Sequence, residues 1–247
     1  MASRVLSLDL GALERGLSAE APREFGGKAA TLASFGGSAL GLAELLRAAV
    51  DQPAAPPPFV VAVGEAVRDG LATAARAALL ARAPLSGLFA EGHVGGELGA
   101  RLARSLDALV LRGRKELAGA VLVLTEDGQP ALVSRPALRG LSAGETNRRL
   151  AQEFAPASVL SIGPAGERGV ALASLASGDA PPSFVGRGGL GAAFGALGLK
   201  ALVVRGVPGS RAGDEGELAR RLARSPRLAA RARGGTLERF AAAAARG

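Results

Sequence analysis

The sequence predicts an α+β fold, because segments with strand and helix patterns follow one another without strict β-α-β alternation. No fixed-period repeat is present, which argues against a solenoid. Apolar residues make up 48% of the chain and aromatic residues only 3%, so we expect an aliphatic core of Ala, Leu and Val. One domain over residues 1–207, followed by a helical linker or extension over residues 208–247, is the simplest partition.

Hydrophobic periodicity identifies most of the expected elements. Short apolar or alternating runs predict strands, and apolar residues that recur every three or four positions predict helices. Two apolar runs flank "EDGQ" at 126–129, and because its Asp-Gly pair suits a tight turn they predict a hairpin. Strands are expected within 3–10, 59–64, 75–87, 108–112, 119–135 (two strands), 158–177 (two strands around a Gly-Pro loop) and 201–206, and helices within 35–50, 95–107 and 142–154.

The chain has no cysteine and one histidine, His93. The lack of cysteine excludes disulfides, thiolate metal sites, cysteine nucleophiles and a cysteine-bound iron–sulfur cluster on this chain. A single histidine also argues against a self-contained zinc site or a serine triad. The chemistry of this protein must therefore come from other residue types or from a bound group.

Composition also bears on membranes and nucleic acids. The longest apolar runs, "FVVAV" and "ALVV", are far too short to span a bilayer, and charges interrupt the N-terminal stretch where a signal peptide needs an apolar run. The net charge of +8 comes mostly from arginines that we assign to solvated helix faces, and few aromatic side chains are present to stack on bases. We expect a cytoplasmic protein that binds neither membranes nor nucleic acid.

The stretch "FVGRGGLGAAFGALGLKALVVRG" at 184–206 combines many glycines with Arg187 and Lys200. Its loose G-x-G-x-x-G has no expected strand before it and no acidic residue about twenty positions later, so it does not fit a dinucleotide-binding loop. Gly-Lys-Ser/Thr is also absent, which excludes a P-loop. Two interpretations stay open: an anion site built from glycine N–H groups and Arg187, or tight turns beside a surface arginine.

His93 lies between glycines in "FAEGHVGGELG", which we take as a loop. A lone histidine in a loop is usually a surface residue or a hydrogen-bonded bystander, and a functional role requires that the two glycine-rich stretches meet. Glu91 and Glu167 are the nearest acids. Nothing local fixes their separation, so the sequence offers little support for a general acid/base pair.

Several motifs together resemble the N-terminal domain of the aldehyde:ferredoxin oxidoreductase family, the tungsten- or molybdenum-pterin enzymes. The most specific pair is "SIGPAGE" at 161–167 followed by "GRGGLGA" and "LKA". Upstream, "FGGSALGLAELL" is similar to the glycine-rich helix start of the family, and "RAALLARAPLSGLFAEGHVGGELG" to its arginine-containing strand, turn and glycine loop. The resemblance covers about residues 3–207.

The resemblance implies a fold of two β-sheets with flanking helices, on which a tungsto- or molybdo-bis-pterin cofactor sits. Arg76 and Arg187 occupy positions whose arginines contact the pterin system. His93 and Gly188 occupy positions whose backbone carbonyls hold a magnesium ion. The complete set of cofactor-binding positions that the resemblance implies is Arg76, His93, Gly95, Gly96, Gly186, Arg187, Gly188 and Gly189.

The resemblance also implies a partner. Family enzymes carry a [4Fe–4S] cluster on cysteines of later domains, which this chain lacks. We therefore expect a cofactor-binding domain or subunit that a separate, cluster-bearing chain completes into an oxidoreductase acting on aldehydes with a ferredoxin-type acceptor, and that is inactive alone. Ser38 stands where the family motif has arginine, which favours the alternative: a non-catalytic scaffold or binding protein that keeps the fold without the cofactor.

Overall fold

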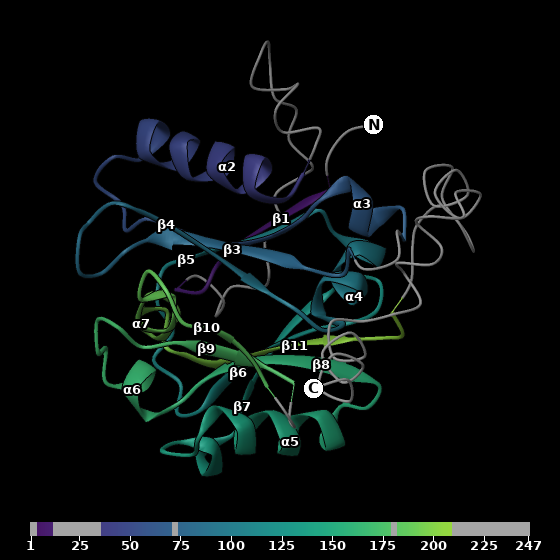
Figure 1. Ribbon diagram of the computed structural model, residues 1–247. Helices are drawn as coiled ribbons and strands as arrows, with labels where there is room; N and C mark the ends of the chain where they lie inside the picture. The colour runs from purple at the N-terminus through teal and green to yellow at the C-terminus, as the bar shows by residue number, and fades with distance from the viewer. Residues whose placement is uncertain (1–3, 12–35, 71–73, 179–181, 209–247) are drawn as a thin grey trace, which may run out of the picture.

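The structure is a computed structural model that describes residues 4–11, 36–70, 74–178 and 182–208. Two mixed β-sheets pack face to face, with one long helix on each outer side (Figure 1). This arrangement confirms the expected α+β fold with two sheets and flanking helices. The helical extension expected over residues 208–247 lies, from residue 209 onward, outside the described residues, so the domain boundary at 207 stays a prediction.

The first sheet has five strands in the order β1-β5-β2-β3-β4. β1 pairs in parallel with β5, and the other neighbours are antiparallel. β2 is buried on both faces because α2 covers one side and the second sheet lies against the other. The elements of this half are β1 (Val5–Asp9), α2 (Gly37–Asp51), β2 (Phe59–Val63), α3 (Glu65–Arg68), β3 (Ala77–Arg82), β4 (Phe89–Val94), α4 (Leu98–Ser105) and β5 (Ala108–Arg112).

The second sheet has six strands in the order β10-β9-β8-β11-β6-β7. Only the β11–β6 pair is parallel among the described strands of this sheet. The elements of this half are β6 (Ala120–Leu124), β7 (Pro130–Ser134), the 3-10 helix η2 (Pro136–Leu138), α5 (Ala143–Glu153), β8 (Ala157–Ile162), α6 (Pro164–Glu167), β9 (Leu175–Ser177), β10 (Ser183–Val185), α7 (Leu190–Ala196) and β11 (Leu199–Arg205). The expected hairpin at 119–135 is confirmed as β6–β7.

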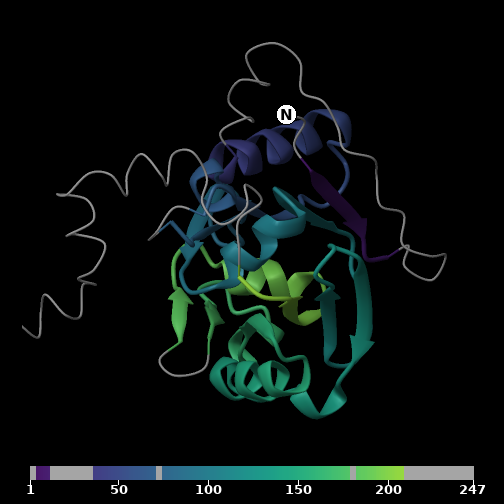
Figure 2. The ribbon, with the colours of Figure 1, turned by 90° about the vertical axis from the view of Figure 1, so that its right-hand side faces the viewer.

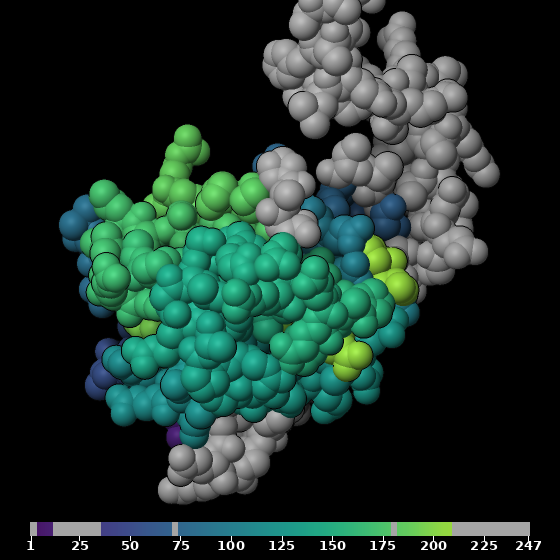
Figure 3. Space-filling view, turned by 90° about the horizontal axis from the view of Figure 1, so that it is seen from below, coloured from purple at the N-terminus to yellow at the C-terminus, as the bar shows by residue number. Residues whose placement is uncertain are grey.

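Side-chain alternation divides the buried residues into three layers. In β2, Val61 and Val63 face the central core between the sheets, whereas Val60 and Ala62 face α2. A third cluster, which includes Val203, lies between the second sheet and α5. The view turned by 90° shows the resulting order of α2, sheet, sheet and α5 from top to bottom (Figure 2). The view from below shows the outer face of the second half, formed largely by the teal part of the chain that contains α5 (Figure 3).

Two short helices occupy the space between the sheets. α4 contributes Leu98 and Leu102 to the central core, and α7 contributes Leu190 and Phe194. The Phe194 ring meets the Phe59 ring edge-on, with centroids 5.3 Å apart and an interplanar angle of 75°. This is a favourable aromatic geometry, and it ties α7 to β2 of the first sheet. The two sheets therefore form one continuous core.

Two local expectations were wrong. His93 lies in β4 rather than in a loop, and a short strand, β10, precedes the glycines at 186–189. Both strands form because a neighbour supplies the ladder, β3 for β4 and β9 for β10. β10 is an antiparallel edge strand, so the strand–loop–helix order does not restore the parallel unit that binds dinucleotides.

Ser142 caps the start of α5. Ser142 Oγ accepts a hydrogen bond from the Glu145 N–H at 3.2 Å. The Glu145 carboxylate accepts hydrogen bonds from Arg148 at 2.8 Å and from Arg149 at 2.6 Å. These two guanidinium groups lower the pKa of Glu145 to about 2.

We expect the Glu145 carboxyl carbon to titrate with a midpoint near pH 2 in a ¹³C NMR experiment. Because its folded pKa lies below that of a free glutamate, its stabilising contribution is present above about pH 4.3 and is lost as the pH falls through 2. The double variant Arg148→Gln/Arg149→Gln should move the midpoint up toward the free value. A wild-type midpoint above 4 would contradict the assignment.

Candidate functional site

Two glycine-rich segments meet where the edges of the two sheets come together. The first segment (residues 92–96) spans the end of β4, and the second segment (residues 186–191) follows β10. β4 and β10 are each the edge strand of their sheet. A methyl group at Gly92 would lie only 2.3 Å from Val185 Cγ1, so glycine at this position permits the close approach of β10.

Residues 183–188, which comprise β10 and the start of the second segment, run along β4. At one end, the Gly95 N–H donates a hydrogen bond to Ser183 Oγ at 3.2 Å. At the other end, a methyl group at Gly188 would lie 2.7 Å from Ala90 Cβ. The structure therefore brings together the two glycine-rich stretches that the sequence analysis required to meet.

The predicted glycines divide into open and packed positions. A side chain at Gly186 or Gly96 would meet no atom within 4 Å, and one at Gly95 only Ser183 Oγ at 3.4 Å. At Gly189 it would lie 2.0 Å from the Ala171 carbonyl oxygen. Backbone at the open positions is accessible to a ligand, whereas glycine at the packed position is needed by the fold itself.

Arg187 and Arg76 are both exposed. Among the described residues, neither guanidinium forms a hydrogen bond or an ion pair. Arg76 directly precedes β3, whose Ala77 pairs with Val94, so it lies at the Gly95 end of β4. Arg187 lies beside Gly188, at the Ala90 end.

Gly95 lies five positions after Ala90, which corresponds to roughly 16 Å at the usual rise of a strand. The predicted residues therefore line a strip along β4 rather than a single pocket. A ligand that followed the strip from end to end would be extended, and negative charge near each end would suit the two arginines because guanidinium groups bind phosphate and carboxylate best.

The side chain of His93 points away from this strip. His93 is the register partner of Ala78, which faces α2, whereas Ala90 and Gly92 face the opposite side. His93 Nε2 lies 2.8 Å from Glu91 Oε1, and Ser38 Oγ in the first turn of α2 donates to the same oxygen. Any role of His93 toward a ligand on the strip must therefore use its backbone.

Sequence reasoning missed the link between Ser38 and Glu91, which are 53 positions apart. Sequence reasoning also identified no partner for Glu167. Glu167 forms an ion pair with Lys200 and accepts from the Gly140 N–H, so it lies in the second sheet half with its own contacts. Glu91 and Glu167 thus have separate partners and do not form a catalytic pair.

The described part of the chain contains no cluster of three or more His, Asp or Glu side chains suited to a metal ion. The open carbonyl of Gly188, which no described donor reaches, is the kind of hard oxygen ligand that magnesium accepts. With the open glycines and two arginines that no described residue pairs with, the residues fit an extended phosphate-bearing cofactor. No described helix has both the length and the apolar character needed to cross a membrane.

Comparisons with known proteins identify relatives of this chain. Tungsten-containing aldehyde ferredoxin oxidoreductases of Pyrococcus horikoshii and Pyrococcus furiosus are each 30% identical to this chain, over 162 and 151 residues. The matches cover 64% and 60% of this chain but only 26% and 24% of those proteins. This chain thus corresponds to about a quarter of the length of these relatives.

One solved structure extends the likeness to the fold. It is the active-site complex BamBC of benzoyl coenzyme A reductase with 1,5-dienoyl-CoA, and it matches with a TM-score of 0.70 and 25% identity over 85% of this chain and 31% of its own. The family model described as aldehyde ferredoxin oxidoreductase, N-terminal domain, matches residues 24–206. The chain therefore belongs to the family of aldehyde ferredoxin oxidoreductase N-terminal domains.

Proposed function

We propose that this chain is the cofactor-holding base of a tungsten- or molybdenum-pterin oxidoreductase. The observation that carries the proposal is the strip along β4, where accessible backbone at Gly95, Gly96 and Gly186 lies near Arg76 and Arg187, two arginines that have no partner among the described residues. The names of the relatives imply tungsten, and the same site chemistry suits molybdenum.

Each strip residue has a defined part in this proposal. Arg76 and Arg187 bind the anionic ends of the cofactor, and the accessible glycine backbone at Gly95, Gly96 and Gly186 allows it to lie against the chain. Gly189 keeps the second segment in its packed conformation. The backbone carbonyls of His93 and Gly188 are the ligands proposed for magnesium.

For the assembled protein we propose the oxidation of an aldehyde and water to a carboxylic acid. Two protons go to solvent and two electrons to a ferredoxin-type acceptor. When bound, the metal–pterin centre supplies this redox chemistry, and the residues of this chain bind and orient it. The sequence contains no cysteine for an iron–sulfur cluster, so we propose that a separate chain carries the cluster. The solved relative, itself a complex, supports an assembly of this kind.

The test is to purify the protein gently from its own host, with whatever co-purifies, and to measure tungsten, molybdenum, magnesium and oxidised pterin fluorescence. We expect about one tungsten or molybdenum per chain. Arg187→Ala should lower retained metal and pterin at least tenfold, because a charge-assisted hydrogen bond contributes about 1.5–3 kcal/mol. Arg205→Ala removes another exposed arginine, one outside the strip, and serves as the matched control.

A second candidate function is a scaffold that has lost the cofactor. It is favoured by the contact between Ser38 and Glu91, which satisfies these side chains within the protein at a position where the resemblance implies an arginine. Wild-type protein free of metal and pterin, taken from cells that make the cofactor, would establish the scaffold and overturn the first proposal. Equal retention by wild type and Arg187→Ala would remove the strip from the cofactor site.

A further inference from the structure

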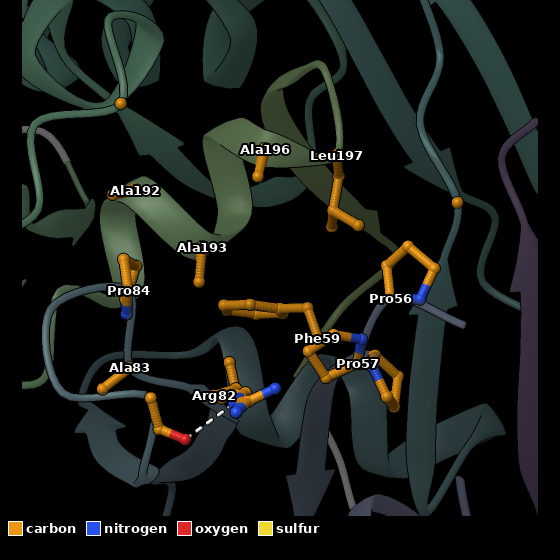
Figure 4. A pocket seen from close by; sticks show the side chains of 15 residues that line it. Pro56, Pro57, Phe59, Arg82, Ala83, Pro84, Ala192, Ala193, Ala196 and Leu197 are labelled. Atoms are coloured by element: carbon orange, nitrogen blue, oxygen red, sulfur yellow. Dashed lines mark hydrogen bonds between the residues drawn. The ribbon is translucent and has the colours of Figure 1, made fainter. Parts of the chain in front are cut away.

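A cavity of about 470 Å³ opens at the side of the central core, and its lining includes no residue of the strip (Figure 4). Its walls come from the chain before β2, from the end of β3 and from α7. The lining residues are Pro56, Pro57, Pro58, Phe59, Ala81, Arg82, Ala83, Pro84, Gly87, Gly113, Gly169, Ala192, Ala193, Ala196 and Leu197. A volume of this size is typical of small-molecule sites.

The inner part of the cavity is apolar. The Phe59 ring projects into it, and Ala193, Ala196 and Leu197 of the α7 region point toward that ring (Figure 4). Phe59 is held in place by its edge-on contact with Phe194. The space exists because α7 presents small alanine side chains here, where larger residues would fill it. The three prolines at 56–58 have fixed φ angles, which limits the backbone conformations available to this wall.

Arg82 is the single charged residue among the described residues of the lining, which include no acidic residue. Its Nε donates to the Gly87 carbonyl oxygen at 2.6 Å, which fixes the guanidinium at the turn after β3, as the dashed line in Figure 4 shows. Its two terminal nitrogens have no partner among the described residues. A guanidinium edge of this kind presents donors that match the two oxygens of a carboxylate.

We propose that this cavity binds an apolar monocarboxylate, with its hydrocarbon part against Phe59 and Ala193 and its carboxylate on Arg82. At about 30 Å³ per water-sized group, the cavity accommodates roughly fifteen non-hydrogen atoms, which corresponds to a medium-chain fatty acid or an aromatic acid. The site shares no residue with the strip along β4, so the proposal does not rest on the pterin assignment.

The test uses the full chain, with octanoate as the probe and octan-1-ol as its uncharged analogue. Binding of each probe is measured by isothermal titration calorimetry. We expect saturable binding of one octanoate per chain. Arg82→Gln keeps a donor for the Gly87 carbonyl but removes the charge, and should weaken octanoate binding at least tenfold while leaving octan-1-ol unchanged. Arg82→Lys should recover part of the loss. Arg205→Gln is the control for a change in net charge.

Ala193→Phe should abolish binding of both probes because the added ring fills the cavity. Should that variant fail to fold, Ala196→Leu fills the cavity from a more exposed wall position and should lower the affinity for both. The proposal is overturned if wild type shows no saturable octanoate binding, or if folded cavity-filling variants bind as wild type does. An equal effect of Arg82→Gln on acid and alcohol would overturn the role of the carboxylate.

Discussion

Gly189→Ala is expected to lower the free energy of unfolding by roughly 2–5 kcal/mol, a large part of the stability of a typical domain. Gly189 has φ +65°, a left-handed conformation that costs an alanine about 1–2 kcal/mol. Its methyl group would also lie 2.0 Å from the Ala171 carbonyl oxygen. Backbone must therefore move to admit it, and such overpacking adds about 1–3 kcal/mol.

The measurement is thermal unfolding followed by far-ultraviolet circular dichroism, since the chain has no Trp or Tyr for fluorescence. A melting temperature about 10 °C lower is expected for a chain of this length. Gly186→Ala is the matched control in the same segment, because its methyl group would meet open space. It should melt as wild type does.

The pair of variants also separates a fold requirement from a ligand requirement. If the cofactor lies against the open backbone, Gly186→Ala should reduce metal and pterin retention with no change in stability. Gly189→Ala should reduce both together. A Gly189→Ala protein as stable as wild type would show that the segment adopts a different conformation from the one described.

Strongly patterned elements could be predicted from the sequence alone. The five consecutive apolar residues of β2 and the capped, periodic sequence of α5 carry local signals that tertiary structure only reinforces. The hairpin at 119–135 is equally local, since Gly128 adopts φ +83° in the turn between its strands. In these segments the local preference and the fold agree.

β4 and β10 could not be predicted in this way. β4 has the sequence "FAEGHV", in which Glu91, Gly92 and His93 weaken the strand pattern, and it forms because β3 provides a complete antiparallel partner. β10 has only three residues after two prolines. Both lie at sheet edges, where pairing on one side is enough. The relevant signal was Gly92, because a glycine within a strand marks the close approach of another chain.

The candidate site needed information beyond local pattern. Composition and spacing left Arg187 open between anion binding and a surface turn, and only the family resemblance joined it to Arg76 and His93. The contacts of β4 with β10 then explained how residues about a hundred positions apart line one strip. The cavity beside Phe59 had no sequence signal, because its alanines and prolines are drawn from three separate segments.

The second large effect on stability is expected for the ion pair of Lys200 and Glu167. Both belong to motifs that carry the family resemblance, yet they contact each other rather than the strip. The Lys200 side chain is 2% exposed, and its Nζ donates to the Glu167 carboxylate and to the Leu141 carbonyl at 2.9 Å. The pair therefore joins β11 to α6 and to the turn before α5.

The two partners of this ion pair should not be equally sensitive. Glu167→Gln leaves the ammonium buried without an opposite charge, which typically costs about 3–5 kcal/mol. Lys200→Met removes the buried charge itself. The Glu167 side chain that remains is 23% exposed and still accepts from the Gly140 N–H, so the loss should be about 1–2 kcal/mol, largely from the unsatisfied Leu141 carbonyl.

Urea unfolding of both single variants and of the double variant measures this asymmetry. The double variant should be close to Lys200→Met alone, because once the lysine is gone the charge of Glu167 has little left to neutralise. Arg135 and Glu153 form an exposed ion pair on the same half of the molecule and provide the control, since Glu153→Gln should cost no more than about 1 kcal/mol. If Lys200→Met lowered the free energy of unfolding as much as Glu167→Gln, the charge interaction of the ammonium would exceed its cost of burial. Lys200 would then stabilise the fold through its charge, and Glu167 would not merely compensate for a buried charge.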